Sequence, residues 1–140
     1  MRFWDASAVV PLILDEAATT SVDRSYVDQP MVVWWGTIVE ATSAIARRER
    51  SGTLSVEVVS DSLALLGDMS RRWIEVPASD ALCRIAQRVV RTHVLRAADS
   101  LQLAAALTAA GGQPGDLEFV CRDTRLTEAA SREGLAVIAA

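Results

Sequence analysis

The chain has 140 residues, of which 51% are hydrophobic and 23% are charged, and its formal net charge at pH 7 is −4. This length and composition are typical of one globular domain with a substantial apolar core, so we expect a single domain over 1–140. The acidic balance argues against strong nonspecific binding to nucleic acid. All fourteen basic residues are arginine, which excludes a P-loop and Schiff-base chemistry because both need lysine.

Targeting signals are not evident. The first residues reach Asp5 at once, unlike a secretory signal, and the most apolar stretch, 101–110, is too short to span a bilayer. Cys83 and Cys121 are far apart and match no metal or redox spacing. We therefore expect a reduced, cytoplasmic setting with no membrane partner.

Short apolar segments alternate with helical segments along the chain, which predicts a parallel sheet with helices on both faces. Glycines stand where helix C-caps belong, at Gly52, Gly111 and Gly134. The expected fold class is α/β, with three α/β/α layers and a central parallel sheet of about five strands. The predicted strands lie near 2–5, 31–35, 73–76, 117–121 and 135–138, and the predicted helices near 6–14, 17–28, 38–51, 56–71, 80–92, 97–110 and 124–133.

Four acidic residues fall at strand ends or helix starts of this pattern: Asp5, Glu40, Asp99 and Asp123. In a parallel α/β sheet these positions share one edge, where ligands bind. Carboxylates gathered at one edge repel each other, and a divalent cation offsets that repulsion. Because carboxylate oxygens suit hard cations, the set predicts a magnesium or manganese site and hence phosphate chemistry.

Each acid also has a structural explanation. Thr37 could be the N-cap of a helix with Glu40 at its N3 position, forming a capping box. Asp5 and Asp123 could cap the helices that follow them, and Asp99 could be a first-turn acid stabilised by the helix dipole. Singly, these explanations are at least as good as a metal site. The metal site is favoured for the set, because all four acids map to the same edge.

Asp99 is the most diagnostic acid, because its helix is apolar almost all round and should be buried. A buried aspartate needs a cation or an ion pair, which Arg96 could provide. Ser7, two residues past Asp5, could bond a carboxylate or a water, or could simply act as an N-cap. His93 has no evident partner and is interpreted as structural. Arg84, Arg88 and Arg91 form a helical stripe, interpreted as a solvated face, with phosphate contacts alongside Arg96 and Arg122 as the alternative.

The segments around the four acids resemble the motifs of the PIN-domain family, and within it those of the VapC-type toxins of bacterial toxin–antitoxin systems. The resemblance covers essentially the whole chain, and its most specific part is the segment around Asp99. One departure is Cys121, where the family commonly has serine or threonine. The segments that carry the resemblance are 4–10 (WDASAVV), 37–54 with Glu40, 93–104 (HVLRAADSLQLA) and 119–126 (FVCRDTRL).

The resemblance implies a PIN-like fold and a Mg²⁺- or Mn²⁺-dependent endoribonuclease that hydrolyses RNA. In this chain Asp5, Glu40, Asp99 and Asp123 match the family's acidic residues, and Ser7 matches its usual hydroxyl. Asp5 and Asp99 are then expected to hold the principal cation, with Glu40 assisting. Asp123 is expected to bind a second cation or to position the attacking water.

The resemblance also implies partners. It predicts a homodimer and a heteromeric complex with a cognate antitoxin, for which helices 6–14 and 38–51 would be docking faces. Two alternatives stay open from the residues alone. One is a non-catalytic PIN-like module that binds RNA or protein, and the other is the same site acting on DNA.

Overall fold

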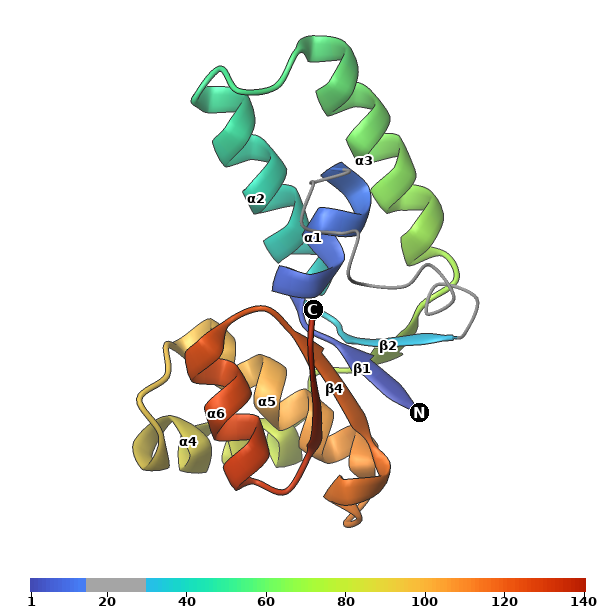
Figure 1. Cartoon of the computed structure of the whole chain (residues 1–140). Coiled ribbons are helices and arrows are strands. Elements are labelled where there is room, and N and C mark those ends of the chain that lie inside the picture. The colour runs from blue at the N-terminus through green and yellow to red at the C-terminus, as the bar shows by residue number, and fades with distance from the viewer. Residues whose placement is uncertain (15–29) are drawn as a thin grey trace.

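The five strands of the described residues form one parallel sheet with the order β3-β2-β1-β4-β5. The structure is a computed structural model and describes residues 1–14 and 30–140 (Figure 1). All five predicted strands are confirmed, with boundaries that move by two residues or fewer. The strands are β1 (Arg2–Trp4), β2 (Met31–Trp34), β3 (Ile74–Val76), β4 (Glu118–Cys121) and β5 (Ala136–Ala139).

Six α-helices connect these strands within the described residues, and the predicted helix at 17–28 lies outside them. Gly111 ends α5 with φ +60°, a left-handed conformation that glycine adopts without steric cost, as the sequence predicts. Among the described residues, no helix is both long enough and apolar enough to cross a membrane. The helices are α1 (Ala6–Leu14), α2 (Thr37–Arg50), α3 (Val56–Ser70), α4 (Asp80–Thr92), α5 (Ala97–Ala110) and α6 (Thr124–Arg132).

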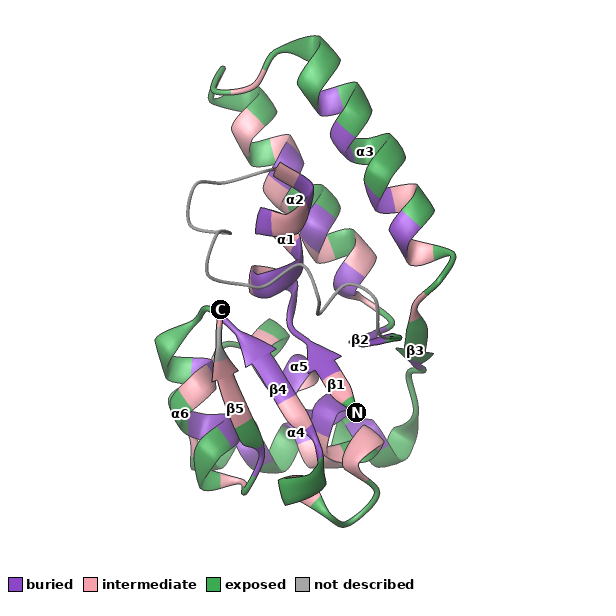
Figure 2. Cartoon of the chain, turned by 45° about the vertical axis from the view of Figure 1, so that its right-hand side comes forward, coloured by how far each residue is buried: buried purple, intermediate pink, exposed green. Residues whose placement is uncertain are grey.

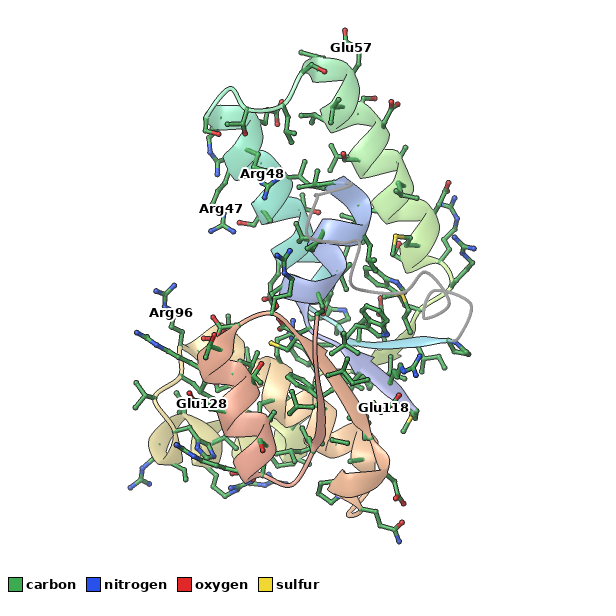
Figure 3. All side chains as sticks on the ribbon, in the orientation of Figure 1. Arg47, Arg48, Glu57, Arg96, Glu118 and Glu128 are labelled. Atoms are coloured by element: carbon green, nitrogen blue, oxygen red, sulfur yellow. The ribbon has the colours of Figure 1, made fainter. Side chains whose placement is uncertain are left out.

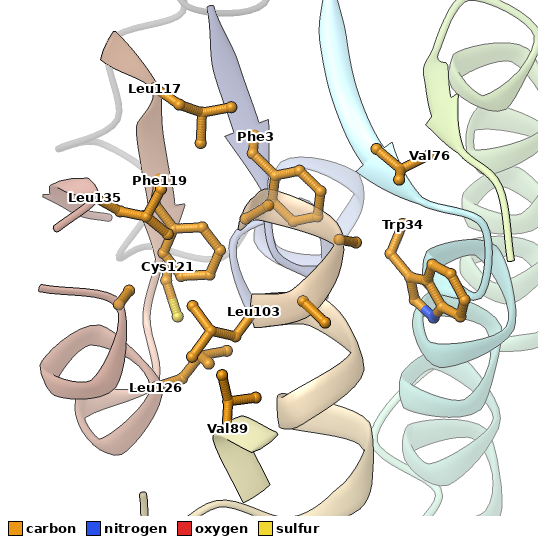
Figure 4. Close-up of a cluster of buried hydrophobic side chains, with 14 of the residues drawn as sticks. Phe3, Trp34, Val76, Val89, Leu103, Leu117, Phe119, Cys121, Leu126 and Leu135 are labelled. Atoms are coloured by element: carbon orange, nitrogen blue, oxygen red, sulfur yellow. The ribbon is translucent and has the colours of Figure 1, made fainter. Parts of the chain in front are cut away.

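The inner strands are apolar on both faces, so each face of the sheet supports a layer of helices. Phe3 belongs to the core cluster under α4, α5 and α6, where its ring stacks on that of Phe119 with centroids 5.7 Å apart (Figure 4). Trp4, the next residue, belongs to the cluster under α1, α2 and α3. This alternation is the period-two pattern of a strand buried on both sides, and Figure 2 shows β1 and β4 buried after a partly exposed first residue in each. The predicted three-layer α/β/α fold is confirmed.

The order of the strands determines where a ligand site can form. The chain runs outward from β1 through β2 to β3 and then crosses back to place β4 on the other side of β1. At such a reversal the connections leave in opposite directions and open a crevice at the carboxyl ends of the strands. Asp5 follows β1 at this edge, and Asp123 follows β4 two residues after the strand ends.

Candidate metal centre

A cavity of about 960 Å³ opens at this edge of the sheet. Its lining includes all four predicted acids and the predicted hydroxyl, although they come from positions spread over more than one hundred residues. The structure therefore brings the sequence-predicted residues to one place. They are Asp5, Ser7, Glu40, Asp99 and Asp123.

Asp5 is the most buried of the acids, with 4% of its surface exposed. Its backbone N–H donates to the carbonyl of Val120 at 3.0 Å, which ties the end of β1 to β4. Its Oδ2 atom accepts a hydrogen bond from the Ser7 N–H at 2.9 Å, so Asp5 also caps α1, as the structural alternative predicts. Burial raises the pKa of Asp5, and the nearby charge of Asp99 raises it further, while hydrogen bonds from Ser7 and Cys121 oppose the shift.

Glu40 is not part of a capping box, and that interpretation of the sequence was wrong. The N-cap of α2 is Gly36, and Thr37 is a fully buried first residue of the helix. Instead, Glu40 Oε1 accepts a hydrogen bond of 3.1 Å from Nε2 of Gln102. Burial raises the pKa of Glu40 to about 7, with further increases from the negative charges of Asp5 and Asp99 and a decrease from Gln102.

Asp99 is half-buried rather than buried, because it lies in the first turn of α5 while the apolar middle of that helix fills the core. Its Oδ2 atom accepts a hydrogen bond of 3.2 Å from the backbone N–H of Arg96, which stabilises the helix start. The contact with Arg96 is thus made by the backbone, and not by the ion pair that the sequence suggested. The charge of Asp99 raises the pKa of both Asp5 and Glu40, so these three carboxylates share one electrostatic environment.

Asp123 is exposed and serves as the N-cap of α6, accepting a hydrogen bond of 2.8 Å from the Leu126 N–H through Oδ1. Cys121 lies between Asp123 and Asp5. Its sulfur accepts from the Asp123 N–H at 3.3 Å and donates to Asp5 Oδ2 at 3.6 Å. Burial and the charge of Asp5 raise the pKa of this thiol to about 12, so it stays protonated and acts as a weak donor where a hydroxyl would be a stronger one.

The Ser7 side chain links the start of α1 to the segment that follows β4. Its Oγ atom accepts a hydrogen bond of 3.0 Å from the backbone N–H of Arg122 and lies 3.7 Å from the sulfur of Cys121. Ser7 also lowers the pKa of Asp5 through both its side chain and its backbone. It therefore favours the ionised form of the carboxylate, which is the form that binds a cation.

Arginines line the same cavity as the acidic residues. Arg47, Arg48, Arg96 and Arg122 belong to its lining, and Figure 3 shows Arg47 and Arg48 on α2 and Arg96 before α5 on the same side of the molecule. The predicted arginine stripe on α4 (Arg84, Arg88 and Arg91) does not belong to this lining, and Arg88 is paired with a carboxylate outside the cavity. It forms a bidentate pair with Glu133, at 2.9 and 2.6 Å.

His93 has a partner that the sequence did not reveal. Its Nε2 atom lies 2.8 Å from Oε1 of Glu133, the residue that also pairs with Arg88. Only 7% of the His93 side chain is exposed. The cluster joins the end of α4 to the end of α6 and so holds the connection that leads to Arg96 and Asp99. Forty residues separate His93 from Glu133, and no local pattern in the sequence indicates the contact.

Gln102 is the site residue that sequence reasoning missed. It lies one turn after Asp99 on α5, is 1% exposed, and contacts Glu40 from the opposite side of the sheet edge. The signal in the sequence was a single long polar residue within the apolar stretch Leu101 to Ala110. A buried amide needs partners, but the sequence does not say which ones.

Carboxylates are the potential ligands for a divalent cation in this cavity. Within residues 1–14 and 30–140, no three histidine, cysteine or carboxylate side chains form a ready-made metal cluster. Magnesium does not require one, because it usually keeps several waters and is held by one or two carboxylates. The mutually repelling carboxylates of Asp5, Glu40 and Asp99 therefore fit a hydrated hard cation, and the protonated thiol of Cys121 does not favour a soft one.

Comparisons with known proteins place the fold. A scan against protein-family models found no match, and a search of curated proteins found no significant similarity. Solved structures do match. The chain has a PIN-like fold. The structure of FitAB bound to an IR36 DNA fragment matches with a TM-score of 0.68 and 16% identity, over 99% of this chain and 94% of that one.

Two further structures agree. PAE2754 from Pyrobaculum aerophilum matches with a TM-score of 0.66 and 20% identity, over 97% of this chain and 87% of that one. FitAcB from Neisseria gonorrhoeae matches with a TM-score of 0.62 and 16% identity, over 99% and 96% of the two chains. At these identities the similarity establishes the fold, and the chemistry has to be argued from the side chains.

Proposed function

We propose that the chain is a Mg²⁺- or Mn²⁺-dependent endoribonuclease. The observation that carries this proposal is the convergence of three carboxylates from three separate elements around one cavity, where Asp99 raises the pKa of Asp5 and of Glu40. Gathered like charges destabilise a fold unless a cation compensates them. The PIN-like fold and the resemblance of the motifs support a nuclease among the possible metal-dependent reactions.

The residues have distinct roles in this proposal. Asp5, Glu40 and Asp99 would hold the cation, while the hydrogen bonds from Ser7 favour the ionised form of Asp5 and hold its carboxylate in place. Asp123, which also lines the cavity, would orient the attacking water or hold a second cation. When bound, the cation activates water and stabilises negative charge on the scissile phosphate. No side chain needs to form a covalent intermediate.

The arginines at the rim support a phosphodiester substrate. Guanidinium groups match the geometry of phosphate oxygens, and they would hold the phosphates that flank the one at the acidic residues. Arg47 and Arg96 are exposed and line the cavity from different helices. This arrangement explains how a chain of net charge −4 could bind a polyanion at one place only. RNA is the substrate that the family resemblance implies, and DNA remains the alternative to be tested.

The experiment is cleavage of total cellular RNA, and separately of single-stranded DNA, by purified protein with Mn²⁺ or with a chelator. Discrete RNA products are expected with the wild type and Mn²⁺, and at least about 100-fold less cleavage with Asp99→Asn. Asp61→Asn is the matched control, because it makes the same change at an exposed position of α3. Equal cleavage by Asp99→Asn and the control would contradict the proposal, and no cleavage with no Mn²⁺ binding would favour the non-catalytic module.

We also propose that this nuclease is the toxin of a toxin–antitoxin pair, acting as a homodimer and held inactive by its antitoxin. Apolar surface on the predicted docking faces supports a protein partner. Val39 on α2 is 65% exposed, and Val10 and Leu14 on α1 are half-buried. Expression of the wild type should arrest growth, Asp99→Asn should not, and co-expression of the adjacent gene should restore growth. Arrest by Asp99→Asn at equal expression would count against a toxic nuclease.

A further inference from the structure

Gln102 is an unusual residue at its position in α5. It is 1% exposed and lies among leucines and alanines, where a polar side chain destabilises the fold unless it is hydrogen-bonded. It follows Asp99 by three residues, so both side chains lie on the same side of the helix. One helix face thus presents a proposed cation ligand and, one turn deeper, a buried amide.

Both hydrogen bonds of this amide reach α2. Its Nε2 atom donates to Glu40 Oε1 at 3.1 Å and to Thr37 Oγ1 at 3.2 Å. The core of α5 belongs to one layer of the fold and that of α2 to the other. Gln102 therefore forms a polar bridge between the layers, and it joins the helix that carries Asp99 to the helix that carries Glu40.

The Gln102 amide makes hydrogen bonds as a donor but not as an acceptor. Both donors of Nε2 are engaged, whereas Oε1 is buried with no hydrogen-bond partner among the described residues. The reverse orientation would place a carbonyl oxygen against the Glu40 carboxylate. Leaving a buried acceptor unpaired is unfavourable, so the arrangement favours the contact with Glu40 over full hydrogen bonding of Gln102.

We propose that Gln102 is a positioning residue, which holds Oε1 of Glu40 so that Oε2 faces the cavity shared with Asp5 and Asp99. The inference rests on the proposed metal-dependent function and adds a residue that acts on the cation through Glu40. Such supporting contacts fix a ligand's orientation before the cation arrives, and their loss typically weakens metal affinity by 10- to 100-fold.

The test is Mn²⁺ affinity, measured by calorimetry on the purified chain, together with the melting temperature of the metal-free protein. Gln102→Met keeps the length of the side chain but removes the donor, and we expect it to bind Mn²⁺ about 10-fold more weakly. Thr37→Val removes the other partner and leaves the Glu40 contact, so its affinity should stay within about threefold of the wild type. A purely structural role would lower the melting temperature of both variants and leave Mn²⁺ affinity unchanged, which would overturn the proposal.

A double-mutant cycle separates action through Glu40 from a general effect on the cavity. In a Glu40→Ala background, Gln102→Met should cause no further loss of Mn²⁺ affinity. An equal further loss would show that Gln102 acts elsewhere and would contradict the proposal. If Gln102→Met does not fold, Gln102→Leu provides the same comparison, because it also removes the donor and adds no charge. Failure of the wild type itself to bind Mn²⁺ would overturn the proposed function as well, whereas wild-type binding with unchanged variants would overturn only the role of Gln102.

Discussion

Among single residues, Glu40 carries the clearest electrostatic signature. Its ordinary pKa of 4.5 rises to about 7 in the fold, chiefly through burial and then through Asp5 and Asp99. Between these two values the folded chain holds a proton that the unfolded chain has lost. Stability therefore falls as the pH rises from about 4.5 to about 7, and it levels off above that range.

Glu40→Gln removes this penalty and keeps an acceptor for Gln102. We expect the metal-free variant to be more stable than the wild type at pH 8, by about 1–2 kcal/mol once solvent screening of this half-buried group is included. At pH 4 the difference should vanish. Urea unfolding with chelator at both pH values measures the free energy of unfolding. A variant less stable than the wild type at pH 8 would contradict the claim that the ionised Glu40 carboxylate destabilises the metal-free fold.

Asp5→Asn separates the cap from the metal ligand. The amide oxygen can still accept the hydrogen bond from the Ser7 N–H, while the repulsion with Asp99 disappears. The metal-free variant should melt at or slightly above the wild-type temperature, but its cleavage of RNA should fall at least about 100-fold. Thermal melts with chelator give the melting temperature, and the cleavage assay run beside them gives the loss of activity. A large loss of stability would mean that Asp5 is mainly a cap.

At the scale of elements, the placement of α2 depends on Gly36. A Cβ atom there would collide with the indole ring of Trp34, which is 7% exposed and has little room to move. Gly36 is also the N-cap of α2, four residues before Glu40. The close approach of Trp34 therefore helps to fix the position from which Glu40 reaches the cavity.

Gly36→Ala should destabilise the fold by about 1–3 kcal/mol and weaken Mn²⁺ binding, because the start of α2 must shift. Gly67→Ala is the matched control, since a Cβ there meets nothing within 4 Å and lies inside α3. It should stabilise the chain by about 0.5–1 kcal/mol. Chemical unfolding and Mn²⁺ calorimetry on both variants test this. Unchanged stability in Gly36→Ala would show that Trp34 can move aside.

The pairing of Glu133 with Arg88 and His93 links α4 to the end of α6. The hydrogen bond from Arg88 is the main cause that lowers the pKa of Glu133 from 4.5, with a smaller effect from His93. The stabilisation is therefore present above pH 4.5 and is lost as the pH falls through the lowered value.

Glu133→Gln should cost about 1–2 kcal/mol at pH 7, and progressively less as the pH falls below 4.5 through the lowered pKa of the wild-type carboxylate. Glu128→Gln, on the exposed face of α6, should change stability very little across this pH range. Urea unfolding across the same range distinguishes these results. An equal effect of both substitutions at pH 7 would show that the cluster adds nothing.

Across the whole molecule, the fold was predictable because strands buried on both faces appear as short apolar runs. Phe3 and Trp4 illustrate this, since one side chain lies in each core cluster. The gathering of Asp5, Glu40 and Asp99 was predictable for a related reason. Residues at strand ends and helix starts of a parallel sheet meet at one edge whatever their separation along the chain.

The contacts within the site were not predictable in the same way. Gln102 gave no periodic signal, because the partner of a buried amide depends on how α2 packs and not on its own neighbours in the sequence. The predicted capping box at Thr37 was wrong because the N-cap of α2 is Gly36, one residue earlier. The Glu40 side chain instead accepts a hydrogen bond from Gln102. His93 and Glu133 meet only once α4, α5 and α6 are packed together.

The most direct measurement is Mn²⁺ binding to the chain by calorimetry at pH 8, with Asp5→Asn, Asp99→Asn and the control Asp61→Asn alongside. The three carboxylates are proposed to form a cation site, so the wild type and Asp61→Asn should bind with the same affinity. Asp5→Asn and Asp99→Asn should each bind at least about 10-fold more weakly. Absence of binding by the wild type, or equal binding by all four proteins, would contradict the metal centre.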